Sequence, residues 1–148
     1  MFWQGVSGNK LWNAKRAWQY TFDYGSGKVT DVLNAWTPQH TNTGLARASF
    51  IDPANNKRPS SYYVEDGSYL RLKNLSIGYN LPATLAARLK ISAARLYVSG
   101  QNLLTLTRYR GYDPEVGRNN LTDLFSVGVD IQAYPQARLI SAGIDLTF

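Results

Sequence analysis

The chain has 148 residues, of which 44% are hydrophobic and 13% aromatic, so it is not a disordered segment and is long enough to bury a core. It contains no cysteine, which excludes a disulfide scaffold and a thiolate metal site. Its net charge of +6 comes from 16 scattered Lys and Arg residues without an RNA-binding or zinc-finger signature, so we expect no nucleic acid as a partner. No apolar run reaches the roughly 18 residues of a membrane-spanning helix.

The first part of the chain shows little regular alternation. We interpret residues 1–8 as the remaining part of a strand, and residues 10–68 as a long loop rich in Asn, Thr, Pro and aromatic residues. Within this loop, KLWNAKRAWQYTF predicts a short helix. WTPQHTNTG and DPANNKRPSS predict turns, because Pro, Gly and Asn favour turn geometry.

Residues 69–81 and 95–107 are predicted to form two long strands, because apolar and polar residues alternate along each of them. In the first strand the apolar phase begins at Leu70 and slips by one residue to reach Leu75, which predicts a β-bulge near 73–74. In the second strand one face carries apolar side chains and the other polar ones: Leu96, Val98, Leu104 and Leu106 against Arg95, Ser99, Gln101, Thr105 and Thr107.

The remaining segments complete the pattern. Residues 82–94 form a short connection, in which Pro82 favours the start of one or two helical turns. Residues 108–137 form a second long loop. Residues 138–148 alternate again, so a third strand is predicted with one largely apolar face: Arg138, Ile140, Ala142, Ile144, Leu146 and Phe148.

The three strands are 11 to 13 residues long. Strands of soluble proteins average about 5–6 residues, whereas a tilted membrane-spanning strand needs about 9–11. Long strands with one apolar face, long loops at one end and a short turn at the other are typical of an outer-membrane β-barrel. We therefore predict an all-β protein, an antiparallel transmembrane β-barrel segment. The alternative is a small soluble β-sandwich that binds carbohydrate or nucleic acid.

Three segments resemble a known family: EDGSYLRLKNLSIGYNLP (Glu65–Pro82), ISAARLYVSGQNLLTLTRYRGYDPEV (Ile91–Val116) and YPQARLISAGIDLTF (Tyr134–Phe148). They are similar to the C-terminal end of SusC/RagA-type TonB-linked outer-membrane transporters. The upstream GNKLWN and WTPQHTNTGLARA resemble the preceding strand end and long surface loop of that family. The resemblance therefore covers nearly the whole chain.

This resemblance implies a barrel of about 22 strands around a plug domain, with this chain supplying roughly the last four strands and no plug. It implies import of oligosaccharides or peptides, a SusD/RagB-like surface lipoprotein as a partner, energy from the TonB complex through the missing plug, and location in the cell outer membrane. The loops 10–68 and 108–137 would then face the outside and the turn 82–94 the periplasm. We expect a fragment that does not transport alone.

The resemblance also gives roles to residues of the last strand. Ile144, Leu146 and Phe148 resemble the C-terminal signal that the barrel-assembly machinery reads when it inserts the last strand. The apolar face of this strand would contact outer-membrane lipid.

Residue patterns for catalysis or metal binding are weak, so we expect no enzyme, no cofactor and no metal. His40, the only histidine, lies in a polar loop, and GSGK at 25–28 lacks the other residues of a phosphate-binding loop. Asp113 and Glu115 flank a proline and predict a turn rather than a Ca²⁺ site, and Asp52 in DPANN predicts a turn as well.

Aromatic side chains in the predicted outer loops are stronger candidates for ligand contact, because flat aromatic faces stack on sugar rings and peptide side chains. The alternatives are that they pack the loops together or form the interfacial girdle of a barrel. The candidates are Trp36, Tyr62, Tyr63, Tyr109 and Tyr112.

Overall fold

A computed structural model of the chain describes residues 1–21, 27–56, 58–116 and 127–148. The chain divides into two compact units, which are described separately. The sheet unit comprises residues 1–7, 68–108 and 135–148, and the loop unit comprises residues 8–67 and 109–134. Most of the predicted loop 10–68 and of the loop 108–137 is thus folded into the loop unit, although 22–26, 57 and 117–126 lie outside the described residues.

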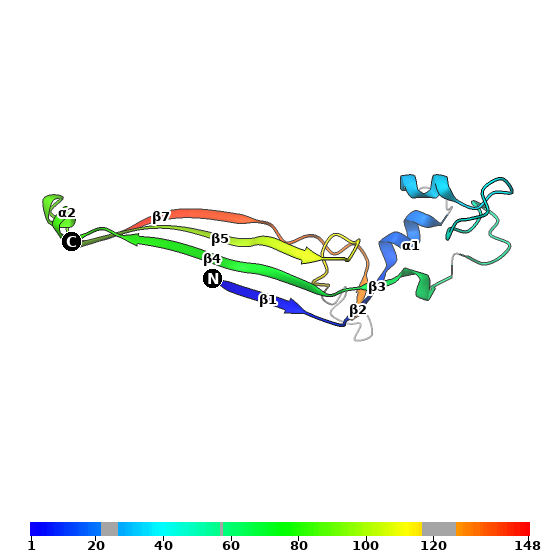
Figure 1. The fold of residues 1–148 in the computed structure, drawn as a ribbon, viewed down its shortest axis with the longest axis horizontal. Coiled ribbons are helices and arrows are strands. Elements are labelled where there is room, and N and C mark those ends of the chain that lie inside the picture. The colour runs from blue at the N-terminus through cyan, green and yellow to red at the C-terminus, as the bar shows by residue number, and fades with distance from the viewer. Residues whose placement is uncertain (22–26, 57, 117–126) are drawn as a thin grey trace. The chain divides into compact units, whose positions relative to one another are not determined.

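The sheet unit is one four-stranded antiparallel sheet (Figure 1). Its strands lie in the order β1-β4-β5-β7. Their bounds are Phe2–Val6 for β1, Tyr69–Asn80 for β4, Ala93–Thr107 for β5 and Leu139–Thr147 for β7. The strands β4, β5 and β7 lie where alternation predicted them, within two residues at each end. With 12 and 15 residues, β4 and β5 are long enough to cross a bilayer at the tilt typical of barrels, which takes about 9–11 residues.

Strand register sorts the side chains of the sheet into two faces. Cross-strand rows on one face are Ile77–Val98–Ala142 and Tyr79–Leu96–Ile144. The rows that alternate with them lie on the other face: Ser76–Ser99–Ser141, Gly78–Tyr97–Gly143 and Asn80–Arg95–Asp145. One face of this half of the sheet is therefore apolar, and the other is small or polar.

The predicted β-bulge is confirmed, but the structure puts its extra residue in the neighbouring strand. The register between β4 and β5 shifts between Leu72 and Asn74, which pair with Leu104 and Gln101. Two residues of β5 therefore face the single residue Lys73. Asn102 is one of the two and has a φ of 52°, a left-handed conformation that Asn tolerates better than most residues.

The connection between β4 and β5 contains a short helix, α2, from Ala83 to Arg88. Pro82 stands at its N-cap, as the sequence predicted, because a fixed φ suits the start of a helix. The helix ends in a turn in which the Ile91 N–H donates to the Ala86 carbonyl and Lys90 adopts a φ of 58°.

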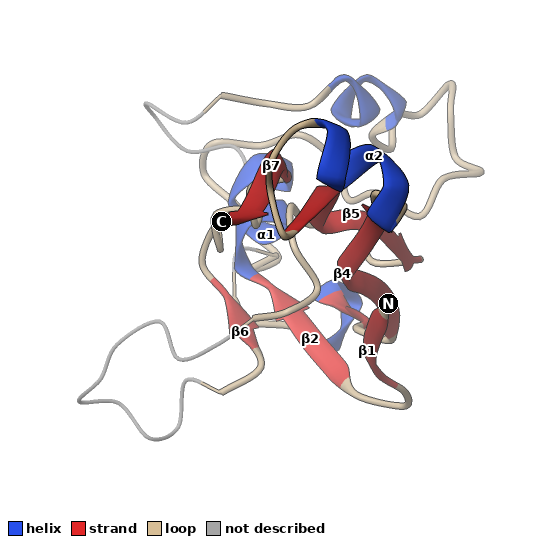
Figure 2. Cartoon of the chain, turned by 90° about the vertical axis from the view of Figure 1, so that its left-hand side faces the viewer, coloured by secondary structure: helices blue, strands red, loops and turns tan. Residues whose placement is uncertain are grey.

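The loop unit is built on a three-stranded sheet with the order β3-β2-β6, and Figure 2 shows β2 and β6 side by side. Its strands are β2 (Lys10–Asn13), β3 (Val64–Asp66) and β6 (Val129–Asp130). The 3-10 helices are η1 (Thr30–Asn34) and η2 (Ser61–Tyr63). Among the described residues no helix has the length and hydropathy needed to cross a membrane.

The helix predicted in KLWNAKRAWQYTF is shorter than that stretch. Its first residues form β2, and the helix α1 runs from Ala14 to Tyr20. It begins there because the Asn13 side chain accepts a hydrogen bond from the Arg16 N–H at 2.9 Å, which caps the first turn. Its face with Ala14 and Ala17 is buried in the loop unit.

Candidate functional site

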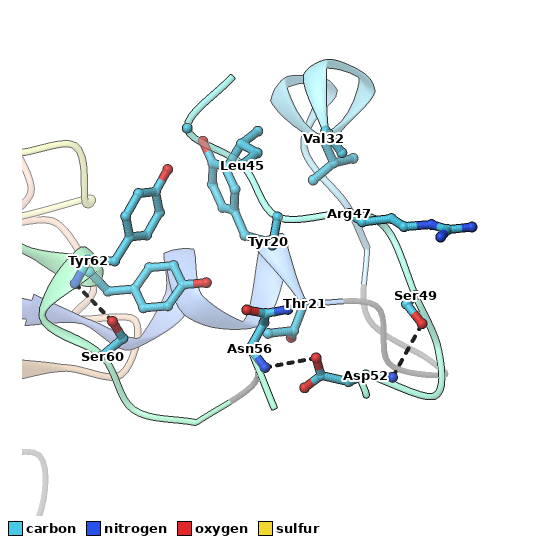
Figure 3. Close-up of a pocket in the computed structure, with 14 residues that line it drawn as sticks. Tyr20, Thr21, Val32, Leu45, Arg47, Ser49, Asp52, Asn56, Ser60 and Tyr62 are labelled. Carbon is cyan, nitrogen blue, oxygen red and sulfur yellow. Dashed lines mark hydrogen bonds between the residues drawn. The ribbon is translucent and has the colours of Figure 1, made fainter. Parts of the chain in front are cut away.

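The loop unit contains a pocket with a volume of about 250 Å³ (Figure 3). Segments from the C-terminal end of α1, from η1, from residues 44–56 and from η2 form its walls. Its lining combines aromatic, small apolar and polar side chains: Tyr20, Thr21, Val32, Ala35, Gly44, Leu45, Ala46, Arg47, Ser49, Asp52, Asn56, Ser60, Tyr62 and Tyr63. We take this pocket as the candidate site because it is a concave surface that gathers aromatic rings and hydrogen-bonding groups.

Arg16 holds two of the pocket's aromatic rings. Its guanidinium carbon lies 5.0 Å from the ring centroid of Tyr20 and 5.4 Å from that of Tyr62, both within cation–π range. Its Nη1 donates to Glu65 Oε1 at 3.0 Å, and the other oxygen of Glu65 accepts the Arg110 N–H at 3.0 Å. Glu65 therefore joins β3 to α1 and to the segment after residue 108, and so fixes the ring positions indirectly.

Tyr62 and Tyr63 belong to η2 and pack edge to face, with centroids 5.2 Å apart and ring planes at 88°. Ser60 starts this short helix, since its Oγ accepts the Tyr62 N–H at 3.2 Å. Tyr62 is 45% exposed, whereas Tyr63 is only 7% exposed. Burial raises the pKa of Tyr63 above its ordinary value, which is already well above neutral pH, so its hydroxyl remains a hydrogen-bond donor.

Polar groups on the opposite side come from the segment that the sequence predicted as a turn. The Asp52 carboxylate accepts the Asn56 N–H at 2.8 Å, and its backbone carbonyl accepts the Asn55 N–H at 2.9 Å. This confirms the turn. The sequence pattern did not predict that Asn56 and the tyrosines of η2 line the same pocket, because this depends on how the loop folds.

Tyr20 was not among the site residues predicted from the sequence. Its hydroxyl donates to Asp31 Oδ2 at 2.6 Å, which ties α1 to η1 across the pocket wall. Burial raises the pKa of Tyr20, and the hydrogen bond to Asp31 raises it further. One feature of the sequence could have indicated Tyr20: Arg16 lies four residues before it, a spacing at which two side chains of a helix are neighbours.

The other three predicted loop aromatics do not line this pocket. Tyr109 is buried, and its hydroxyl donates to Asp130 Oδ2 at 2.5 Å. Burial, followed by this hydrogen bond, raises the pKa of Tyr109. Tyr112 is exposed and lies under the ammonium group of Lys15, 3.0 Å from its ring centroid. Trp36 is half-buried, and its backbone N–H donates to the Leu45 carbonyl.

The polar residues that the sequence placed in turns lie in turns. His40 is exposed, and its N–H donates to Thr37 Oγ1 at 3.0 Å. Asp113 accepts the Glu115 N–H at 2.9 Å, which is the predicted turn geometry. Across the described ranges, no cluster of three or more His, Cys, Asp or Glu residues could hold a metal ion.

The apolar face of the sheet is exposed. Ile77, Val98 and Ile144 are 67%, 53% and 63% exposed, so no layer of described residues in the sheet unit covers them. Leu146 and Phe148, the other predicted residues of the assembly signal, are exposed as well. A soluble protein rarely leaves a contiguous apolar surface of this kind open to water.

Comparison with known proteins agrees with these features. The chain is 41% identical to TonB-dependent receptor P3 of Formosa agariphila over 100% of its own length and 14% of the receptor's. It is 34% identical to TonB-dependent receptor P26 of the same organism, covering 99% of the chain and 15% of the receptor. It is 30% identical to TonB-dependent receptor SusC of Bacteroides thetaiotaomicron over 60% of the chain and 8% of that protein. No protein-family model matches it.

Solved structures with a similar fold come from related transport proteins. A chain of the RagAB peptide importer in its closed-closed state superposes with a TM-score of 0.77 and 31% identity, over 99% of this chain and 15% of that one. The open-open state gives a TM-score of 0.74 with 30% identity, over the same shares of the two chains. Both fold and sequence thus define a mostly β-sheet region of TonB-dependent receptors, 14–15% of the length of the first relatives.

The chain belongs to the SusC/RagA-type family of TonB-dependent receptors.

Proposed function

We propose that this chain is the C-terminal part of an outer-membrane TonB-dependent importer, whose closed barrel has about 22 strands around a plug. The observation that carries the proposal is the long-stranded sheet whose apolar face is exposed while its other face is small or polar. In a barrel wall, lipid covers an apolar face of this kind, and the water of the lumen hydrates the polar face.

The edges of the sheet support closure with further strands. The sheet ends in β1 on one side and β7 on the other. An open edge in lipid leaves backbone amides unsatisfied, at several kcal/mol for each group, so these strands need neighbours from the rest of the receptor. This requirement favours a barrel that the remaining sequence completes.

In this proposal the two ends of the sheet face opposite sides of the membrane. The loop unit, with most of 10–68 and 108–137, faces the medium, and the turn 82–94 faces the periplasm. The exposed apolar row of Ile144, Leu146 and Phe148 is read by the barrel-assembly machinery during insertion. Tyr62 and Tyr63 then belong to the surface that incoming substrate meets first.

Substrate and partners follow from the relatives. Because the family contains SusC and the RagAB peptide importer, we propose that the receptor imports peptides or oligosaccharides and takes its energy from TonB. Its partner is a SusD/RagB-like surface lipoprotein. The relatives are receptors and an importer, and the proposal gives this chain no catalytic role.

Single-cysteine labelling of the full-length receptor tests this topology, and these 148 residues contribute no cysteine of their own to the background. Leu33→Cys in the loop unit and Arg88→Cys in the turn both replace exposed residues. In intact cells, a membrane-impermeant maleimide should label Leu33→Cys and leave Arg88→Cys unlabelled until the outer membrane is opened. The receptor without either change is the control.

Equal labelling of both positions in intact cells, or recovery of the receptor in the soluble fraction, would contradict the proposal. The second result would restore the β-sandwich alternative. That alternative requires a second layer over the apolar face, and the described residues of the sheet unit provide none.

A further inference from the structure

The pocket of the loop unit has a size suited to one unit of a longer ligand. Its volume is about 250 Å³, whereas pockets that enclose whole small molecules have about 300–1,000 Å³. One sugar ring or one amino-acid side chain fits a cavity of that size. The chemistry of the lining distinguishes these two occupants.

Apart from the Arg47 guanidinium, three polar side-chain groups of the lining have no hydrogen-bond partner in the part of the chain that the structure describes. They are the hydroxyls of Tyr62 and Tyr63 and the side-chain amide of Asn56, whose backbone N–H alone is used in the turn with Asp52. Tyr63 is largely buried, but its hydroxyl is not among the buried polar atoms that lack a partner. Because no partner for it is seen among the described residues, the hydroxyl must reach accessible space. Because Tyr63 lines the pocket, we infer that this space is the pocket.

These groups disfavour an apolar side chain as the occupant. Covering a donor or acceptor without pairing it costs about 5- to 100-fold in affinity for each group. A ring that carries several hydroxyl groups pairs with them instead, and it presents C–H faces to the aromatic walls. A sugar ring would thus hydrogen-bond to the polar residues of the lining and pack against the aromatic ones.

The electrostatics favour a neutral ring. The Asp52 carboxylate is engaged by the Asn56 N–H in the turn. Figure 3 shows the Arg47 side chain extending away from the other lining residues, so its charge does not point into the cavity. An anionic ligand would therefore find no positive charge directed at it (Figure 3), and the one carboxylate of the lining is already hydrogen-bonded within its turn.

The aromatic wall is held in place before any ligand arrives. Arg16 stacks on Tyr62 and Tyr20, and Tyr63 packs edge to face against Tyr62. Glu65 anchors Arg16 through its ion pair at 3.0 Å. A preorganised wall favours binding, because less conformational entropy is lost when the ligand docks.

From these observations we propose that the pocket binds a single pyranose ring of a neutral oligosaccharide, with Tyr62 as the stacking face and Tyr63 and Asn56 as hydrogen-bonding groups. This inference rests on the proposed function, because it requires a loop unit that meets substrate in the medium. Of the two substrate classes proposed above, peptides and oligosaccharides, the inference selects oligosaccharides.

Calorimetry on the purified full-length receptor in detergent tests this assignment. The probes are a pool of neutral hexasaccharides built from gluco-, galacto-, manno- and xylopyranose units, and a pool of hexapeptides. We expect binding from the hexasaccharide pool. Tyr63→Phe, which removes one hydroxyl and keeps the ring, should weaken it about three- to tenfold. Asn56→Ala should weaken it similarly, and Tyr62→Ala more strongly.

Tyr134→Phe is the matched control, since Tyr134 is exposed in the same unit and lies outside the pocket. It should leave the affinity unchanged. Absence of binding from the whole hexasaccharide pool would overturn the inference, and so would binding that Tyr63→Phe and Asn56→Ala leave unchanged. Binding of hexapeptides alone would also overturn it and still leave the importer intact, whereas the cysteine labelling tests the importer separately.

Discussion

At the scale of single residues, Asp130 organises one side of the loop unit. Its carboxylate is buried, and one oxygen accepts the N–H groups of Gln132 and Ala133 at 2.9 and 2.7 Å. The other oxygen accepts the Tyr109 hydroxyl. Both oxygens of this buried carboxylate are thereby hydrogen-bonded, which offsets part of the cost of burying it. The sequence offered no sign of it, because the partners are up to 21 residues away.

Gly111 allows this pair to form, and replacing it should destabilise the loop unit. A Cβ at this position would lie 2.2 Å from the Tyr109 ring and 2.6 Å from Asp130 Oδ2. Gly111→Ala should therefore cost about 1–3 kcal/mol, a typical price of overpacking. Protease sensitivity of the loop unit in the full-length receptor should rise.

Gly27→Ala is the control for this change, since a Cβ at Gly27 would meet no atom within 4 Å. Equal protease sensitivity of the two variants would show that the Tyr109–Asp130 pair does not hold this part of the unit together.

At the scale of elements, alternation was sufficient to predict β4, β5 and β7, because each of these strands has one face that differs chemically from the other. It also located the β-bulge, but it could not tell which strand carries the extra residue. That depends on the pairing partner, and Asn102 in β5 lies about thirty residues from the slip in β4. Alternation missed the short strands β2, β3 and β6, since two to four residues give no measurable period.

The two faces of β4 should respond differently to charge. Ile77 lies on the exposed apolar face, and Ser76 lies on the polar face beside it. A lysine on the lipid side of a barrel strand costs about 2–4 kcal/mol near the middle of the bilayer. Ile77→Lys should therefore lower the amount of receptor in the outer membrane, as measured by immunoblot.

Ser76→Lys is its control, because in the proposed barrel a lysine there would enter the hydrated lumen and should leave the level near that of the parent. Similar losses in both variants would argue against a lipid-facing and a lumen-facing side.

The end of β7 should matter for assembly rather than for stability. Phe148 is 89% exposed and makes no packing contribution that its loss would remove. In the full-length receptor, Phe148→Ala should nevertheless lower the outer-membrane level if the assembly machinery reads this side chain. Thr147→Ser, on the opposite face, should leave that level unchanged. An unaltered level in Phe148→Ala would reject the assembly signal.

At the scale of the whole molecule, the two units differ in how far they could be predicted. The sheet repeats one pattern, so local sequence determines most of it. The loop unit depends on contacts between distant segments, such as Arg16 with Glu65 and Trp12 with the Ser60 carbonyl. These contacts have no periodic signature, which is why Tyr20 and Asn56 were absent from the predicted site.

The 148 residues produced alone should not form a stable soluble protein. The apolar face of the sheet has no cover in its own unit, and β1 and β7 are open edges of the kind that pair with other chains. In water we therefore expect aggregates with a high β content by circular dichroism, and dispersal only in detergent. Size-exclusion chromatography decides the matter. A monomer eluting near 16.6 kDa without detergent would mean that the loop unit or another layer covers the face in solution, and that the β-sandwich alternative describes the chain better than a segment of a barrel wall.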